Sequence, residues 1–324
     1  MAYPVETNLF TFSFKETTKT VGLVTLLVAA LLVFDRIAVA FLDKLYMHVR
    51  TGQTGGKINQ YLLLETQPDV LIMGNSRALY QIIPDSISPT AFNISHAGMG
   101  PGFQTGLLSI LAQKNRLPKK ILLHIEPSDF TTEQSNTDIQ NLKFYYHENS
   151  YVRDQINRIS KYEKYKFWFS MYRYNGRLMP LIKNLVLNRE EAKLGGYEWI
   201  SPTPQDSINT IYSYEKAKAY KEAAFDQDQL LFLEAFLDIC AKHNIQVVAF
   251  TSPLFNHLNQ FPTATHQLVQ FLTPKNIPLI RLTDAEQAVL SDPFLWKDAF
   301  HLNHTGAQIQ SRLISEKLKK IWPN

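Results

Sequence analysis

Five short, continuous apolar runs follow one another along the chain from residue 70 onward. They occupy residues 70–73, 91–94, 120–125, 246–250 and 277–282. Segments with apolar residues at helical spacing separate them, as at Leu230, Leu233, Phe236, Leu237 and Cys240. Short apolar runs are typical of strands covered on both faces, and their alternation with helices indicates a parallel sheet. The pattern therefore predicts an α/β domain.

Connection rules limit how five such strands can be ordered. Crossovers between parallel strands are right-handed, and the order 2-1-3-4-5 is common. In that order the direction of strand addition reverses between the first and third strands, and ligands bind beyond the carboxyl ends of the strands at such a point. Residues 74–76, 95–102 and 126–129 would meet there.

A segment from about residue 130 to 226 carries no strand pattern and interrupts the domain, which we place at residues 67–324. It is polar, helical in places, and holds 11 of the chain's 15 tyrosines. We interpret it as a mainly helical insertion. Its aromatic rings, with Lys164, Lys166 and Arg173, could bind an acidic sugar polymer. Alternatively, the aromatic residues form a small core of their own or rest on a membrane interface.

The N-terminal region is the most apolar part of the chain. Residues 21–34 carry no charge, and apolar residues 37–42 follow Asp35 and Arg36. The uncharged run is shorter than the about 20 residues that cross a bilayer, but extension to Thr17 or snorkelling of Arg36 makes up the difference. We expect a single transmembrane anchor within residues 1–45. A cleaved signal peptide and a buried core helix are the alternatives.

Residues 46–66 are polar and contain a glycine-rich stretch at 51–56, which suggests a flexible tether between anchor and domain. More basic residues follow the anchor than precede it, which weakly favours a cytoplasmic domain. Long domains, however, cross membranes largely regardless of such charges, so the count does not fix the orientation.

The overall composition limits the partners. The chain has 33 basic and 29 acidic residues, spread along its length, so nothing points to nucleic acid. Cys240 is the only cysteine, so no intrachain disulfide can form. No pattern predicts a cofactor or a metal.

Candidate chemistry begins at Ser76, which follows the first predicted strand across the turn at Gly74 and Asn75. A serine at a helix start is usually a cap, yet this position also lies at the binding edge of an α/β sheet. Near the end of the chain, Asp298-x-x-His301 precedes the final helix. A nucleophilic serine needs a base, and the base needs an acceptor that fixes its tautomer, so these residues could form a triad.

Two further features have more than one interpretation. Asp298, His301 and His304 could bind a metal, although no further carboxylate or thiol supports this. Glycines in the loop at 95–102 could offer an oxyanion the N–H of Gly98, with a second donor from the turn at Ser76. Taken alone, these glycines are better explained by a tight turn.

Together these motifs resemble the blocks of the SGNH (GDSL-type) hydrolase family. Gly74-Asn75-Ser76 matches the first block, Asn93-x-x-x-x-Gly98 the second, and Asp298-x-x-His301 the fifth, in the family's order across about residues 68–320. The resemblance implies a flavodoxin-like, three-layer α/β/α core and ester hydrolysis or acyl transfer. It also implies Ser76 as nucleophile, His301 as base, Asp298 as the acid that orients the base, and Gly98 as an oxyanion donor.

Two positions depart from the family. Asn75 stands where the family usually has Asp, at a non-catalytic position beside the nucleophile that we count among the substrate-binding residues. The third block normally ends Gly-x-Asn-Asp, and its Asn completes the oxyanion hole; here Ser128, in Glu126-Pro-Ser-Asp129, takes that place. A hydroxyl can donate one hydrogen bond but is shorter, and losing such a donor lowers turnover about 100- to 1000-fold. A weak esterase, a specialised transferase and a degenerate site all fit this change.

An N-terminal anchor joined to such a domain resembles the membrane-tethered members that act on bacterial envelope polymers. Those members add or remove acyl groups on polysaccharides or teichoic acids, often beside a membrane O-acyltransferase. The resemblance implies a single-pass protein of the bacterial cytoplasmic membrane whose catalytic domain is extracytoplasmic. We expect an esterase or acyltransferase for acyl, most simply acetyl, esters of an envelope polysaccharide. The alternative is a non-catalytic, membrane-anchored scaffold that binds an envelope glycan or the partner acyltransferase.

Overall fold

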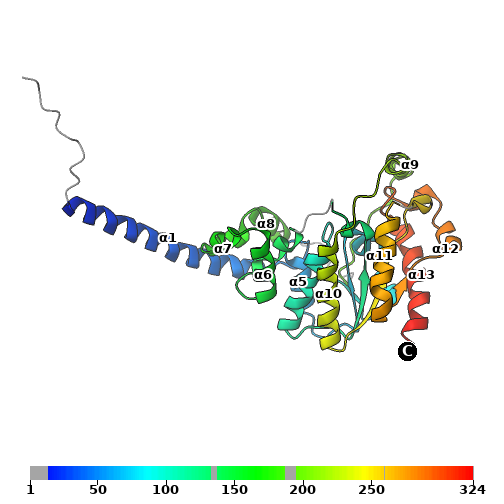
Figure 1. Cartoon of the computed structure of the whole chain (residues 1–324), viewed down its shortest axis with the longest axis horizontal. Helices are drawn as coiled ribbons and strands as arrows, with labels where there is room; N and C mark the ends of the chain where they lie inside the picture. Colours follow the sequence, from blue (N-terminus) through cyan, green and yellow to red (C-terminus); the bar gives the residue numbers. More distant parts are fainter. Residues whose placement is uncertain (1–13, 133–136, 187–194, 259, 324) are drawn as a thin grey trace, which may run out of the picture.

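The computed structural model describes residues 14–132, 137–186, 195–258 and 260–323. Helix α1 (Phe14–His48) extends away from a body that contains the other elements (Figure 1). The first half of the body contains α2 (Gly56–Leu62), β1 (Val70–Met73), α3 (Ser76–Gln81), α4 (Pro84–Ile87), β2 (Phe92–Asn93), α5 (Pro101–Gln113), β3 (Lys120–His124) and the 3-10 helix η1 (Pro127–Phe130).

The next elements, up to the last strand, are η2 (Asp138–Tyr145), α6 (Ser150–Ile159), α7 (Glu163–Lys166), η3 (Ser170–Tyr174), α8 (Leu178–Val186), α9 (Asp206–Ala217), α10 (Gln227–Lys242), β4 (Gln246–Phe250), η5 (Phe255–His257), α11 (Pro262–Leu272), η6 (Thr273–Lys275) and β5 (Leu279–Ile280). The chain closes with α12 (Asp284–Ala288), η7 (Pro293–Leu295) and α13 (His304–Ile321).

The sheet confirms the predicted topology. Its five strands are all parallel and lie in the order β2-β1-β3-β4-β5. The two edge strands are shorter than the apolar runs that predicted them. At one edge, the run at 277–282 contains Pro278, which has no N–H to donate, and only Leu279 and Ile280 remain in the ladder.

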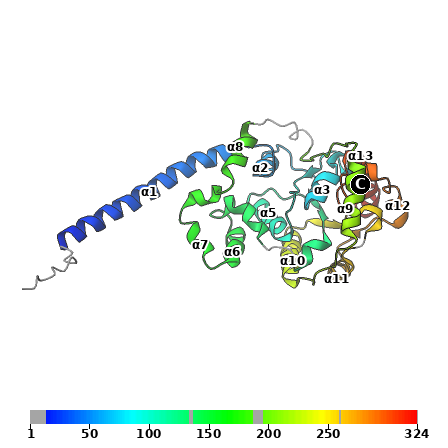
Figure 2. The same cartoon turned by 90° about the horizontal axis from the view of Figure 1, so that it is seen from above.

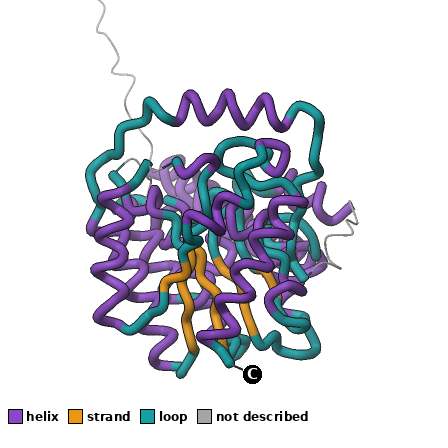
Figure 3. Tube along the Cα trace, turned by 90° about the vertical axis from the view of Figure 1, so that its right-hand side faces the viewer, coloured by secondary structure: helices purple, strands orange, loops and turns teal. Residues whose placement is uncertain are grey.

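Side chains of the strands alternate between two apolar cores, one on each face of the sheet. On β1, Leu71 and Met73 join the core that includes α5 and α10, whereas Val70 and Ile72 join the core that includes α3 and α13. Figure 3 shows the strands between these helical layers. Burial on both faces explains why the strands are continuously apolar.

The structure differs from the expected tether at residues 46–66. This stretch holds the end of α1 and all of α2, and its Ile58 and Tyr61 are buried in the core. The glycines there allow close approach of the backbone, because a Cβ on Gly56 would lie 1.9 Å from the carbonyl oxygen of Thr51. The glycine-rich stretch therefore forms a tight turn packed between α1 and α2.

Between β3 and α10 the described residues are mainly helical. Helix α8 lies beside the C-terminal half of α1 in both Figure 1 and Figure 2, and α6 and α7 lie at the same end of the body. Helix α9 lies across the end of the sheet at which the strands finish, and it runs along the top of Figure 3. The insertion thus reaches both the α1 end of the body and the carboxyl edge of the sheet.

Within the described residues, α1 is the one helix long and apolar enough to cross a membrane. Its candidate span, Thr18–His48, has a mean hydropathy of 2.3 in its best window, and 11% of that window is buried. These properties fit a single membrane anchor, and a signal sequence shares them.

Candidate active site

Ser76 is the first residue of α3, directly beyond the end of β1. The side chain of Asn75 caps this helix, because its Oδ1 accepts a hydrogen bond from the N–H of Arg77 at 3.0 Å. Gly74 precedes it, and a Cβ on Gly74 would lie 2.5 Å from the Cβ of His124 on the neighbouring strand β3. Glycine is therefore required for the turn that presents Ser76 at the carboxyl edge of the sheet.

The structure brings Ser76, His301 and Asp298 into one hydrogen-bonded chain. The Oγ of Ser76 lies 2.9 Å from Nε2 of His301. Nδ1 of the same ring lies 3.1 Å from each carboxylate oxygen of Asp298. A proton on Nδ1 that points at the carboxylate leaves Nε2 free to accept the proton of the hydroxyl.

The carboxylate of Asp298 accepts hydrogen bonds from the backbone as well as from the His301 ring. The backbone N–H groups of Phe300 and His301 donate to its Oδ1 at 2.8 and 2.9 Å. Partial burial acts to raise the pKa of Asp298, but the His301 ring and these backbone donors outweigh it and hold the pKa below its ordinary value. The carboxylate therefore stays ionised at neutral pH, as an orienting acid must.

The glycine loop, residues 95–102, forms another wall of the site. Gly98 has φ of 70°, and it lines a cavity of 170 Å³ together with Ser76 and Asn75. Asp138 of the insertion secures this loop, because its Oδ2 accepts hydrogen bonds from the N–H groups of Gly100 and Phe103 at 2.9 and 3.0 Å. Gly98 is thus held beside the serine.

Ser128 follows β3, which pairs with β1 on the side away from β2, the strand that leads into the glycine loop. Ser128 lines an open cleft of 360 Å³ that also contains Ser76 and His301. Asn75 borders both spaces, and its Nδ2 donates to Oδ2 of Asp129 at 3.5 Å. All six residues that the sequence predicted for the site therefore gather around one point at the carboxyl edge of the sheet.

The loop that carries the histidine, residues 297–303, is here called the base loop, and α9 braces it on both sides of Asp298. The N–H of Ala299 donates to Oγ of Ser213 at 2.8 Å. The Nζ of Lys297 pairs with Oδ1 of Asp206 at 3.0 Å. Asp206 is fully buried, so its carboxylate is a fixed point to which the base loop is tied.

The same part of the insertion also holds the start of α13. The N–H of His304 donates to the carbonyl of Ile200 at 2.8 Å, and Nδ1 of His304 lies 3.1 Å from the hydroxyl of Tyr197. His304 therefore packs against the insertion, with its ring beside Tyr197 and Trp199.

A buried ion pair lies behind the nucleophile. The guanidinium of Arg77 pairs with Glu126 at the end of β3, and it donates to the carbonyl oxygens of Ser252 and Pro253 at 2.5 and 2.6 Å. Arg77 thus ties the segments that follow β1, β3 and β4 to one another. Removing one partner would leave a buried charge uncompensated, so the pair fixes the edge on which Ser76 stands.

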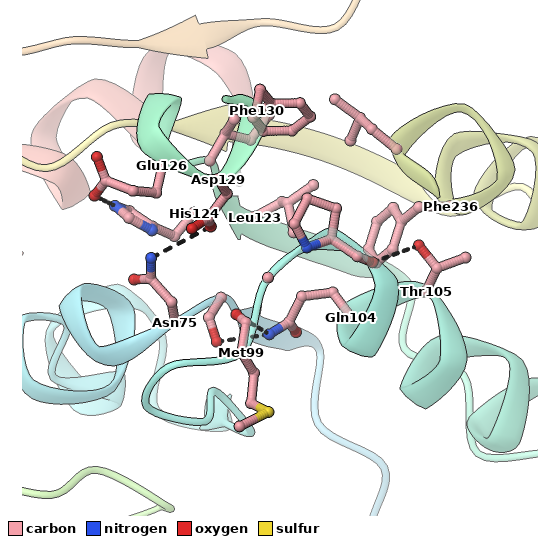
Figure 4. Close-up of a pocket in the computed structure, with 15 residues that line it drawn as sticks. Asn75, Met99, Gln104, Thr105, Leu123, His124, Glu126, Asp129, Phe130 and Phe236 are labelled. Atoms are coloured by element: carbon pink, nitrogen blue, oxygen red, sulfur yellow. Dashed lines mark hydrogen bonds and ion pairs between the residues drawn. The ribbon is translucent and has the colours of Figure 1, made fainter. Parts of the chain in front are cut away.

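Asp129 faces the same cavity as Ser76 and points toward Asn75 (Figure 4). Burial and the negative charges of Glu126 and Asp138 raise the pKa of Asp129 well above its ordinary value. Its neutral form, which can donate a hydrogen bond, therefore persists to a higher pH than in an ordinary aspartate.

A second, smaller cavity adjoins the one beside Ser76 and is drawn in Figure 4. The two share Asn75, Gly100, Pro101 and Asp129. Its volume of 20 Å³ is enough for about one methyl group or one water molecule. Its apolar walls come from Met99, Leu123, Phe130, Leu233 and Phe236.

Sequence reasoning missed the residues that support the site. Arg77 and Asp129 stand beside predicted site residues, so their adjacency was an available signal. Asp138, Asp206 and Ser213 belong to the insertion, where nothing in the sequence pattern ties them to loops far away in the chain.

The chain matches no family model and no curated protein sequence. Among solved structures, a candidate acylhydrolase of Bacteroides fragilis is similar with a TM-score of 0.39 and 12% identity, over 81% of this chain and 94% of that chain. A candidate platelet activating factor of Streptococcus pneumoniae is similar with a TM-score of 0.32 and 14% identity, over 87% and 99% of the two chains. These likenesses concern the fold alone, so the activity has to be argued from the site.

Proposed function

We propose that the protein is a membrane-anchored serine esterase or acyltransferase that acts on short acyl esters, most simply acetyl esters, of a bacterial envelope polysaccharide. The observation that carries the proposal is the hydrogen-bonded chain from Ser76 through His301 to Asp298. A nucleophile, a base and an orienting acid in contact are the minimum that acyl transfer through a serine requires.

In the first step, Oγ of Ser76 attacks the ester carbonyl while Nε2 of His301 takes the hydroxyl proton. Asp298 keeps the ring oriented and stabilises its positive charge. The tetrahedral intermediate then loses the alcohol, which receives the proton from His301, and an acyl-serine remains. In the second step, water or a sugar hydroxyl gives its proton to His301 and attacks the acyl group. His301 then returns this proton to Oγ of Ser76 as the bond to the serine breaks and the acid or a new ester leaves.

The negative oxygen of the intermediate needs preorganised donors. We assign this role to the N–H groups of Gly98 and Ser76 and to the hydroxyl of Ser128. The position of Ser128 in the cleft that Ser76 and His301 also line supports the assignment. Because a serine hydroxyl is shorter than an asparagine amide, we expect a weaker oxyanion hole and modest turnover.

Two spaces beside Ser76 support the choice of substrate. The small apolar cavity behind Asn75 suits the methyl end of a short acyl group. The cleft on the other side is open, and Tyr220, Phe261 and Phe300 are among its lining residues. Aromatic faces with polar neighbours suit a sugar ring. We therefore place the acyl group toward the cavity and the glycan in the cleft.

The exposed, apolar α1 supports anchoring in a membrane. We further propose that this is the bacterial cytoplasmic membrane and that the body lies outside the cytoplasm, where an envelope polysaccharide or teichoic acid would be the substrate. A membrane O-acyltransferase is a fitting partner, because it would supply the acyl group. Protease treatment of intact spheroplasts checks the topology: we expect the body to be degraded, and full protection would contradict an extracytoplasmic site.

Turnover of a chromogenic acetyl ester and of acetylated glycans by the purified full chain tests the activity. We expect Ser76→Ala and His301→Ala to abolish turnover. Ser88→Ala and His243→Ala are the controls, because Ser88 precedes β2 and the exposed His243 precedes β4, at the edge of the sheet opposite the site. Glycan binding without turnover by the unsubstituted, folded chain would instead support the scaffold.

A further inference from the structure

From Phe34 onward, α1 presents two different faces. One face packs on the insertion and is buried: Asp35, Val39, Leu42 and Tyr46 are 2%, 6%, 9% and 5% exposed. The other remains apolar and exposed: Phe34, Ile37 and Phe41 are 63%, 66% and 63% exposed. The exposed face continues the apolar surface of the N-terminal half of the helix, where Val21 is 59% exposed.

The insertion covers the charge that interrupts the apolar run. The N–H groups of Ser170 and Met171 each donate to the carboxylate of Asp35 at 2.8 Å. The neighbouring Arg36 donates to the side chain of Ser170 and, at 3.4 Å, to the carbonyl of Trp168. The acid is therefore satisfied by protein donors and has no need of water.

This arrangement changes the length of helix that can lie in lipid. Residues 21–34 span only about 21 Å at 1.5 Å per residue, which is less than the about 30 Å of a bilayer core. With Asp35 covered, the exposed apolar face runs to Phe41, and residues 21–41 span about 31 Å. The membrane surface then lies level with the part of α1 on which the insertion docks.

At that level the insertion exposes large aromatic and apolar side chains. Figures 1 and 2 show α7 at the end of the body nearest the free part of α1. We name as the collar Tyr162, Tyr165, Trp168, Phe169 and Met171, which are 60%, 47%, 67%, 47% and 37% exposed.

Basic residues accompany the collar. The Nζ atoms of Lys161 and Lys164 lie 5.1 Å from the ring centroids of Tyr162 and Tyr165. Soluble surfaces rarely expose so many large apolar side chains together, whereas Trp, Tyr and Lys side by side are typical of the interface between lipid and water. The lysines also complement anionic headgroups.

We propose that the collar lies in the interfacial layer of the same bilayer that α1 crosses, with Lys161 and Lys164 among the anionic headgroups. The inference rests on α1 being a membrane anchor. The collar and α1 then hold the body as one unit at the membrane surface. In this orientation α9, which lies at the other end of the body from α7 in Figures 1 and 2, points away from the lipid.

Spin labels on the full chain in vesicles of phosphatidylethanolamine and phosphatidylglycerol test this. Because Cys240 is the only native cysteine, a Cys240→Ala background allows single labels at Trp168→Cys and Tyr165→Cys. Leu27→Cys reports on the middle of α1, and Tyr212→Cys on α9 is the matched aromatic control, with 72% exposure. Collision rates with oxygen and with a water-soluble nickel chelate measure the depth of each label.

We expect the label at residue 27 to favour oxygen most strongly, the collar labels to be intermediate, and the label at 212 to favour the nickel chelate. If the label at 27 lies in hydrocarbon while the collar labels match the one at 212, the collar proposal is overturned, the anchor stands, and the collar is free for a protein partner. If the label at 27 lies in water, both anchor and collar fail. Acetyl ester turnover, measured on the same variants, reports on the proposed chemistry independently of either result.

Discussion

The glycine loop and the base loop both border Ser76. The insertion holds each of them with an aspartate, through a different kind of donor. Asp138 accepts two hydrogen bonds from uncharged backbone N–H groups of Gly100 and Phe103. Asp206 accepts from a cation, Lys297. One segment of the chain therefore supports both walls of the site, but the two walls respond differently to charge.

The pKa values of the two aspartates shift in opposite directions. Burial raises the pKa of Asp138, and the backbone donors only partly offset it. Burial also acts to raise the pKa of Asp206, but hydrogen bonds from Thr203 and the charge of Lys297 outweigh it and lower the pKa. The contrast follows the facing charge, because Asp138 has uncharged backbone donors whereas Asp206 faces the cation of Lys297.

The largest effect on turnover should follow a change of Asp298 itself, because its carboxylate contacts the ring of His301 directly. Asp298→Asn keeps the shape but loses the charge and favours the wrong ring tautomer of His301. We expect turnover of an acetyl ester to fall by about 10⁴-fold with little change in KM. Steady-state kinetics measure this, and a loss below tenfold would mean that Asp298 does not orient the base.

The contacts of α9 with the base loop should have the next largest effect on turnover. Asp206→Asn removes the partner charge of Lys297, and we expect about a tenfold loss of turnover because small displacements of reacting groups have large effects. The free energy of unfolding should fall by about 1–2 kcal/mol, as for a buried hydrogen bond to a charged group. Ser213→Ala removes the other contact of α9 with the base loop. If either single variant turned over saturating substrate as fast as the unsubstituted chain, the contact would act on substrate binding alone.

The pH dependence of stability should separate the two aspartates. Asp206 has a lowered folded pKa, so its stabilising contribution is present above the unfolded pKa of about 3.9 and is lost as the pH falls through the lower folded value. Asp138 has a raised folded pKa, so its contribution is present below about pH 3.9 and is lost as the pH rises through the higher folded value.

Thermal unfolding from pH 4 to pH 8 of Asp206→Asn and Asp138→Asn measures this difference. At neutral pH we expect the first variant to be less stable than the unsubstituted chain and the second to be equal or more stable. A loss of stability in both variants, or a gain in both, would contradict the contrast between Asp206 and Asp138.

The smallest effect is expected where the insertion contacts α1. Asp43 on α1 pairs with Arg173 at 2.9 Å and also accepts from the hydroxyl of Tyr174, on the far side of the insertion from α9. Asp43→Asn should leave turnover of a small soluble ester within about twofold, since it touches neither loop of the site. A large loss in detergent-solubilised, folded protein would indicate that the anchor side of the insertion acts on the site.

Much of the fold followed from local patterns. The apolar runs predicted all five strands and their order, because parallel strands buried on both faces leave a plain signal and crossover rules permit few arrangements. The same order explains why Ser76 and the glycine loop meet. The tether was misjudged because glycine residues that permit a tight turn, as Gly56 does, have the composition of a flexible linker.

The supports of the site could not be predicted in the same way. Asp206 and Lys297 are 91 residues apart, and their contact depends on how the insertion crosses the end of the sheet. Hydrophobic periodicity says nothing about such a crossing. Asp298 and His301, by contrast, are three residues apart, so local spacing was enough to suggest their contact. Their catalytic role stays a prediction.

Labelling of the folded full chain with a fluorophosphonate probe, followed by mapping of the modified peptide, tests the central claim most directly. An activated serine reacts with such a probe, whereas a serine that only caps a helix does not. We predict a single adduct on Ser76 that disappears in both Ser76→Ala and His301→Ala and persists in Ser88→Ala and His243→Ala. Labelling that survives Ser76→Ala, or no labelling of the folded, unsubstituted chain, would contradict a serine-based active site.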